Sequence, residues 1–219
     1  MKLVAINGSP RRTANSAQML KAFEAGYISV DPDAQVEYVD LYTLKFTGCI
    51  SCFSCKRKNG EFYGKCPVKD GIHDLIEHCY DADAVAIAAP IYFGDINAQT
   101  KCFLERALFS RTTYRLSHDS LALKPVPVTM LYTMNCPREI AEEIGYHNTF
   151  DTTELYIANA FRHPVERVCA YNTYQFNNYE HFEMELFREE DKRAYRDENF
   201  EADLRAAFDA GVRAARLKQ

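Results

Sequence analysis

The most constraining feature of the sequence is the run Ala84–Ala89, which reads AVAIAA and contains no polar side chain. A continuous apolar run of this length is typical of a strand that is buried on both faces. Such strands lie in the middle of parallel sheets that are covered by helices on both sides. The run therefore predicts an α/β fold.

Further strands and helices are predicted on both sides of this run. Four other short segments have the pattern of strands, namely Lys2–Ile6, Gln35–Asp40, Val126–Leu131 and Val165–Tyr171. Helical spacing of apolar residues is found between or after them, in Asn15–Ser29, Asp70–Cys79, Gln99–Phe109, Thr153–Phe161 and Phe200–Leu217. This alternation predicts a five-stranded parallel sheet of order 2-1-3-4-5, with right-handed crossovers and helices on both faces.

The domain organisation and surroundings of the chain can also be predicted. No linker or repeat divides the chain, so we expect one domain over residues 1–219, with a cysteine-rich loop at 48–67 and an aromatic, charged surface excursion at 172–196. The formal charge of -5 favours neither nucleic acid nor a membrane surface as a partner. The N-terminal apolar run Leu3–Ile6 is too short for a signal peptide, and no stretch approaches the roughly 18 apolar residues of a membrane helix. We therefore expect a cytoplasmic protein.

The loop after the first strand has the composition of an anion site. Ligands of such sheets bind beyond the carboxyl ends of the strands. Here Gly8 permits a tight turn, the hydroxyl and amide groups of Ser9, Asn15 and Ser16 follow, and Arg11 or Arg12 adds a forked cation suited to phosphate. The loop matches neither the Walker A nor the G-x-G-x-x-G pattern. Two interpretations remain open: a seat for a phosphate monoester, or an ordinary turn with a helix N-cap.

The loop after the third strand carries aromatic residues. Pro90 fixes the turn, Gly94 permits close backbone approach, and Tyr92 and Phe93 can place their rings against a planar ligand or fill the core. Both loops belong to the same edge of a 2-1-3-4-5 sheet. Together they favour a mononucleotide, with its phosphate at the first loop and its ring at the other.

These residues resemble a known family. The chain is similar to the NADPH-dependent FMN reductases of the flavodoxin-like superfamily, and in particular to the branch that contains the iron–sulfur flavoproteins. The resemblance covers roughly the first 135 residues and is carried by Gly8-Ser9-Pro10-Arg11, Asn15-Ser16, Ala82-Asp83, Pro90-Ile91-Tyr92-Phe93-Gly94 and Lys101-Cys102-Phe103-Leu104-Glu105-Arg106.

The resemblance implies a flavodoxin-like three-layer sandwich that binds FMN. It places the FMN phosphate on Ser9, Arg11, Asn15 and Ser16. It places the isoalloxazine ring between Pro90, Ile91, Tyr92, Phe93 and Gly94, and the ring or ribityl chain against Thr133, Met134 and Asn135. It also implies a homodimer or homotetramer.

The implied activity is hydride transfer from NADPH or NADH to FMN and onward to a small-molecule acceptor such as a quinone or a flavin. Because the cofactor supplies the reactivity, we expect no catalytic acid–base side chain. The alternative is an electron carrier, like a flavodoxin or an iron–sulfur flavoprotein, that serves a redox partner protein.

The cysteine-rich loop contains Cys49-x2-Cys52-x2-Cys55, followed after ten residues by Cys66-Pro67. This set suits a [4Fe–4S] cluster, and iron–sulfur flavoproteins resemble it, although their fourth cysteine usually follows after a shorter gap. Structural zinc, a redox-active dithiol among basic residues, and partly buried thiols without chemistry are the other interpretations.

Overall fold

The sheet contains five parallel strands in the order β2-β1-β3-β5-β6. This computed structural model describes residues 1–217. The strands are β1 (Lys2–Asn7), β2 (Gln35–Asp40), β3 (Ala84–Tyr92), β5 (Val128–Thr133) and β6 (Val165–Ala170), and a short β4 (Asp95–Ile96) pairs antiparallel with the end of β3. The predicted α/β class and the strand order 2-1-3-4-5 are confirmed.

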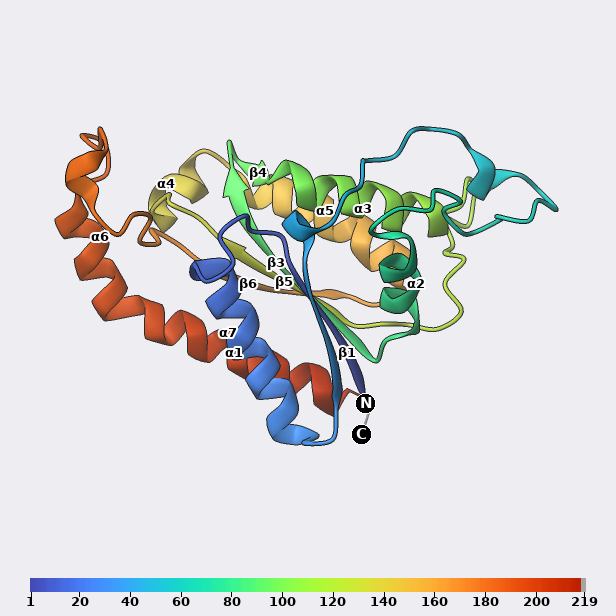
Figure 1. Ribbon diagram of the computed structural model, residues 1–219, viewed down its shortest axis with the longest axis horizontal. Helices are drawn as coiled ribbons and strands as arrows, with labels where there is room; N and C mark the ends of the chain where they lie inside the picture. Colours follow the sequence, from blue (N-terminus) through green and yellow to red (C-terminus); the bar gives the residue numbers. More distant parts are fainter. Residues whose placement is uncertain (218–219) are drawn as a thin grey trace.

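Helices cover both faces of the sheet and give three layers (Figure 1). One face carries α1 (Asn15–Val30) and α7 (Glu201–Arg216), and the other carries α2 (His73–Asp81), α3 (Ala98–Arg111) and α5 (Tyr146–Phe161). Shorter elements complete the chain: helices α4 (Arg138–Glu143) and α6 (Glu189–Tyr195), 3-10 turns at Leu41–Thr43, Ser54–Lys56 and Tyr179–His181, and a π turn at Arg196–Phe200. No helix within residues 1–217 is long and apolar enough to cross a bilayer.

Strand β3 shows why the chain forms two cores. Val85 and Ile87 point into the core beneath α2, α3 and α5, whereas Ala84, Ala86 and Ala88 point into the core beneath α1 and α7. All of these side chains are fully buried, as the apolar run predicts. The small alanine side chains leave room for α1 and α7 to lie close to the sheet.

Two glycines set the distance between α1 and α7. A Cβ atom on Gly26 would lie 2.0 Å from the carbonyl oxygen of Phe208, and one on Gly211 would lie 2.0 Å from that of Phe23. The two backbones therefore touch, and a larger residue at either position has to separate the helices.

Several element boundaries differ from those predicted. Helix α2 begins at His73 rather than Asp70, because the Asp70 carboxylate accepts a hydrogen bond from the Ile72 N–H and pairs with Arg106. Helix α5 begins seven residues earlier than predicted, after Gly145 with φ +80°. Strand β3 continues through Pro90 to Tyr92, because the chain turns back there to form β4.

Candidate functional site

The carboxyl ends of four strands meet at one edge of the sheet. Asn7 of β1 lies opposite Ala88 of β3, and Thr133 of β5 lies between Pro90 of β3 and Ala170 of β6. The loops that follow β1, β3 and β5 are the loops that hold the predicted flavin residues. The topology therefore brings them to the same edge.

The loop after β1 leads into a helix whose first turn has no side-chain cap. Ala14 occupies the N-cap position, and the first turn of α1 contains no acidic residue. Ser9, Asn15 and Ser16 are buried around this end, and Arg11 is exposed. An uncapped helix N-terminus presents free N–H groups and the positive end of the helix dipole, so an anion is favoured there.

Asn97 joins the loop after β1 to the loop after β3. Its side-chain nitrogen donates to the Gly8 carbonyl at 2.7 Å, and its backbone N–H donates to the Pro90 carbonyl at 3.1 Å. The Thr100 hydroxyl donates to the Asn97 side chain at 2.7 Å, and a Cβ atom on Gly8 would lie 2.0 Å from that hydroxyl oxygen. The sequence analysis did not single out Asn97 or Thr100. The available signal was the position of Asn97, two residues before the predicted helix Gln99–Phe109.

The predicted loop Pro90–Gly94 is the end of β3 and the turn of a β-hairpin. Phe93 and Gly94 both have positive φ, +52° and +81°, as a two-residue hairpin turn requires. The Phe93 side chain is fully exposed and Tyr92 is 43% exposed, while Pro90 is buried. Burial raises the pKa of Tyr92, and the nearby Arg11 guanidinium opposes that rise. The interaction places an aromatic residue of the hairpin near a cation of the loop after β1.

The loop after β5 also contacts this end of α1. The Thr133 and Ser16 hydroxyls are hydrogen-bonded at 2.7 Å, and both residues are buried. Met134 is buried, and the side-chain oxygen of Asn135 is buried without a hydrogen-bond partner among the described residues. An unpaired acceptor at this edge is available to a ligand N–H group.

The start of the segment 172–196 closes over the same edge. The Asn15 side chain donates to the Tyr174 carbonyl at 2.9 Å, and Arg11 donates to the Gln175 carbonyl at 2.5 Å. The Thr173 N–H donates to the Met134 carbonyl at 2.9 Å. This segment is expected to be a surface excursion, but its first residues connect the loops after β1 and β5. Arg11 and Asn15, predicted to bind phosphate, are engaged by it.

The four loop cysteines line one small pocket of about 20 Å³, together with Arg106. The Arg106 Nε donates to the Cys66 sulfur at 3.4 Å. Backbone and hydroxyl hydrogen bonds from Ser54 lower the pKa of Cys52, whereas burial raises the pKa of Cys55. Within residues 1–217, no three His, Cys, Asp or Glu side chains are arranged so that they could hold a metal ion. The pocket has room for about one water molecule, so the loop has to open to admit a larger group.

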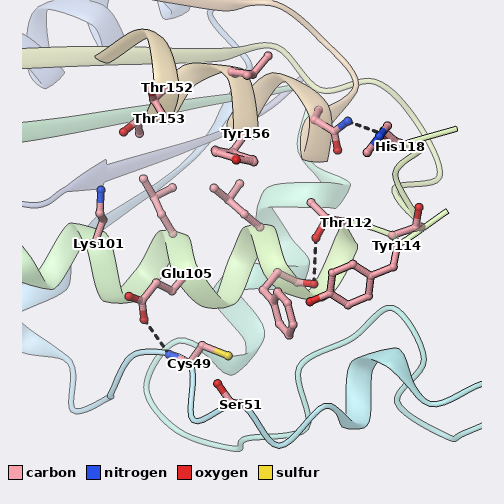
Figure 2. Close-up of a pocket in the computed structure, with 16 residues that line it drawn as sticks. Cys49, Ser51, Lys101, Glu105, Thr112, Tyr114, His118, Thr152, Thr153 and Tyr156 are labelled. Atoms are coloured by element: carbon pink, nitrogen blue, oxygen red, sulfur yellow. Dashed lines mark hydrogen bonds between the residues drawn. The ribbon is translucent and has the colours of Figure 1, made fainter. Parts of the chain in front are cut away.

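A larger cavity of about 960 Å³ lies between α3 and α5 (Figure 2). Tyr156 of α5 and Glu105 of α3 project into it, and the Cys49 N–H donates to the Glu105 carboxylate at 3.1 Å. Cys49 also lines the four-cysteine pocket, so the two hollows are neighbours. None of the predicted flavin residues lines this cavity.

Comparison with known proteins decides the family. Residues 1–134, more than half of the chain, match the description NADPH-dependent FMN reductase. The chain belongs to the NADPH-dependent FMN reductase family. Its match ends at Met134, so the segment 172–196 lies outside it.

Curated proteins that are similar to this chain in sequence include iron–sulfur flavoproteins. One from Methanocaldococcus jannaschii is 29% identical over 116 residues, covering 53% of this chain and 56% of its own length. One from Archaeoglobus fulgidus is 34% identical over 108 residues, covering 49% of this chain and 46% of its own length. The chain therefore spans about half the length of the curated relatives it matches.

Solved structures confirm the fold over nearly the whole chain. An NAD(P)H:quinone oxidoreductase from Methanothermobacter marburgensis superposes with a TM-score of 0.70 at 18% identity, covering 97% of this chain and 96% of that one. An azoreductase from Bacillus anthracis gives a TM-score of 0.69 at 14% identity, covering 97% and 99%. The flavodoxin-like architecture is thus established, and the roles of individual site residues stay predictions.

Proposed function

We propose that this protein is an FMN-dependent NAD(P)H oxidoreductase that passes electrons to a small acceptor such as a quinone or a flavin. The observation that carries the proposal is the uncapped N-terminus of α1, which lies at the sheet edge beside the hairpin of β3 and the loop after β5. Family membership and the fold support it.

The residues at this edge fit FMN. The free N–H groups at the start of α1, with Ser9 and Ser16, would hold the phosphate, and Arg11 and Asn15 lie at its margin. The exposed Tyr92 and Phe93 would border the ring, and the unpaired acceptor of Asn135 would meet a ring N–H group. When bound, FMN supplies the redox chemistry, so the protein contributes binding, orientation and charge rather than an acid–base side chain.

Titration of the purified apoprotein with FMN tests the site. The expected result is one FMN per chain with quenched flavin fluorescence. Ser16→Ala should weaken binding about tenfold, or about 1.4 kcal/mol, because it removes one hydroxyl from the anion seat and from its bond to Thr133. Ser29→Ala, at the other end of α1, is the matched control and should leave binding unchanged. A protein that takes up no FMN would refute the proposal.

Rapid mixing of the FMN-loaded protein with NADPH or NADH separates the enzyme from the alternative electron carrier. Fast bleaching of the flavin supports the oxidoreductase. Slow or absent bleaching supports a carrier that serves a protein partner. The exposed apolar side chains beside the cysteine pocket, Ile50 at 63% and Phe53 at 51%, favour this second candidate as a docking surface.

We further propose that Cys49, Cys52, Cys55 and Cys66 bind a [4Fe–4S] cluster. Their convergence on one pocket and the sequence relatives that are iron–sulfur flavoproteins support this. Iron and acid-labile sulfide, assayed in protein purified without air, should be present in wild type and lost in Cys66→Ser. Cys169→Ser in β6, outside the loop, should keep both. Zinc without sulfide, or no metal, would support the other interpretations of this loop.

A further inference from the structure

Lys192 of α6 is a buried lysine. Its side chain is almost fully enclosed, with a residue exposure of 1%, and its ammonium group donates to the carbonyl oxygen of Asn135. The Phe187 ring lies beneath the ammonium, 4.7 Å from its centroid. Within residues 1–217, no carboxylate forms an ion pair with it.

The burial of an unpaired ammonium has a free-energy cost. One carbonyl and one aromatic face recover only part of the hydration that the group loses. Burial accordingly lowers the pKa of Lys192 to about 8, and the neighbouring Cys136 thiol opposes the shift. The group is still mostly charged at neutral pH. An apolar side chain of the same length would pack there without this cost, so packing alone does not account for a lysine.

The position of this charge indicates its use. Asn135 lies in the loop after β5, two residues after Thr133, which is hydrogen-bonded to Ser16 in the predicted phosphate seat. The side-chain oxygen of Asn135 is buried and has no hydrogen-bond partner within residues 1–217. Lys192 thus fixes the backbone of the residue whose side chain is free for a ligand.

We propose that Lys192 is a positioning residue: it holds the loop after β5 through the Asn135 carbonyl and adds a buried positive charge to the flavin site, which favours reduced FMN. The inference rests on the proposed function. Reduction increases the negative charge on the flavin ring, and a fixed cation nearby stabilises the reduced form more than the oxidised form. The lysine lies outside the part of the chain that matches the family.

Three variants separate the two roles. Lys192→Met removes both the donor and the charge, Lys192→Gln keeps a donor without the charge, and Lys192→Arg keeps both. Exposed Lys21 on the outer side of α1 provides the control, Lys21→Met. For each protein, the dissociation constant of oxidised FMN and the midpoint potential of bound FMN are measured, the latter by equilibration with a reference dye.

We expect Lys192→Met to weaken the binding of oxidised FMN several-fold. The binding of reduced FMN should weaken by about a further tenfold, which lowers the two-electron potential by about 30 mV. Lys192→Gln should restore the affinity for oxidised FMN but not the potential, and Lys192→Arg should restore the potential. Wild-type affinity and potential in both neutral variants would overturn the inference. If Lys192→Met does not fold, Lys192→Gln alone decides, because an unchanged potential in it overturns the charge role.

The same experiment distinguishes the two levels of the proposal. A wild-type protein that binds no FMN refutes the proposed function and, with it, this inference. If the wild-type protein binds FMN and the two neutral variants have the same FMN affinity and potential as wild type, only the role of Lys192 is refuted.

Discussion

At the scale of single residues, the candidate site depends on close contacts that tolerate little change. Gly8 is hydrogen-bonded on both sides: its N–H donates to the Ala88 carbonyl at 2.8 Å, and its carbonyl accepts from the Asn97 side chain at 2.7 Å. This arrangement fixes the end of β1 relative to the loop after β3. The predicted anion seat begins at the next residue, so its geometry depends on Gly8.

Gly8→Ala should destabilise the protein by about 1 to 3 kcal/mol and weaken FMN binding, because the new Cβ would lie 2.0 Å from the Thr100 hydroxyl. Urea denaturation and FMN titration measure the two effects. Thr100→Ala removes the atom in conflict, so the double variant should lose less stability than the sum of the two single variants. Simple additivity would show that the contact does not limit this position.

A buried carboxyl gives a second prediction at this scale. One oxygen of Asp203 in α7 is buried without a hydrogen-bond partner in the described part of the chain, and burial raises the pKa of this residue to about 6. The folded state therefore favours the protonated acid, and stability should fall as pH rises from about 4 to about 6. Asp203→Asn should remove this fall and raise the free energy of unfolding at pH 7 by about 1 to 2 kcal/mol.

Urea denaturation at pH 4 and pH 7 measures the effect of Asp203→Asn. The increase in the free energy of unfolding should be present at pH 7 and nearly absent at pH 4, where the Asp203 carboxyl of the folded wild-type protein is already neutral. Glu201→Gln, an exposed carboxyl in the same helix, should change little at either pH. An equal gain at both pH values would contradict the assignment.

At the scale of elements, the contact between α1 and α7 covers one face of the sheet. The two helices touch through Gly26 and Gly211. Glycine is a poor helix former, so its presence inside both helices indicates that the residue at these positions is set by the space between the helices rather than by helix propensity.

Gly26→Ala should lower the free energy of unfolding by about 1 to 3 kcal/mol, although alanine by itself favours a helix by about 1 kcal/mol over glycine. The reason is that the Cβ atom would lie 2.0 Å from the Phe208 carbonyl oxygen. Denaturant unfolding provides the measurement. Ala206→Gly, at an exposed site of α7, is the control that measures the effect of helix propensity alone. A Gly26→Ala protein that is more stable than wild type would contradict the close contact between the two helices.

At the scale of the whole molecule, the two candidate redox sites lie apart. The flavin edge contains Asn97, directly before α3, whereas the cysteine pocket contains Arg106, Phe109 and Ser110 of the second half of α3. Arg106 follows Asn97 by nine positions, which corresponds to about 14 Å along the helix axis. We propose that the protein is a homodimer or homotetramer.

The exposed face of α5 is the surface where we expect two copies to meet. Leu155 and Tyr156 border the cavity between α3 and α5 and are 65% and 57% exposed. Leu155→Glu should weaken self-association at least tenfold, because burying a leucine contributes about 1.5 to 3 kcal/mol and burying a carboxylate opposes association. Sedimentation equilibrium measures the change. Leu123→Glu, also exposed but outside this cavity, is the control, and a wild-type monomer would refute the proposal.

The order of the strands and the identity of the site loops were predictable because both depend on local patterns. The run Ala84–Ala89 indicates a strand buried on both faces, and parallel strands place their following loops at one edge whatever the details of packing. Ser9 and Ser16 could be assigned to that edge for the same reason, whereas Thr133 was implied by the family resemblance. Element ends were less predictable, since Gly145 and the contacts of Asp70 decide where α5 and α2 begin.

The sequence by itself determined the sheet, the two loops of the candidate site and the set of four cysteines, because each depends on a pattern of residues that are close together along the chain. Only the tertiary structure decided that Asn97 joins the two loops, that residues 172–175 close over them, and that Lys192 lies against Asn135. These contacts join residues far apart along the chain, up to 164 positions for Arg11 and Gln175. Their physical cause is the packing of side chains and carbonyl groups that no local pattern records.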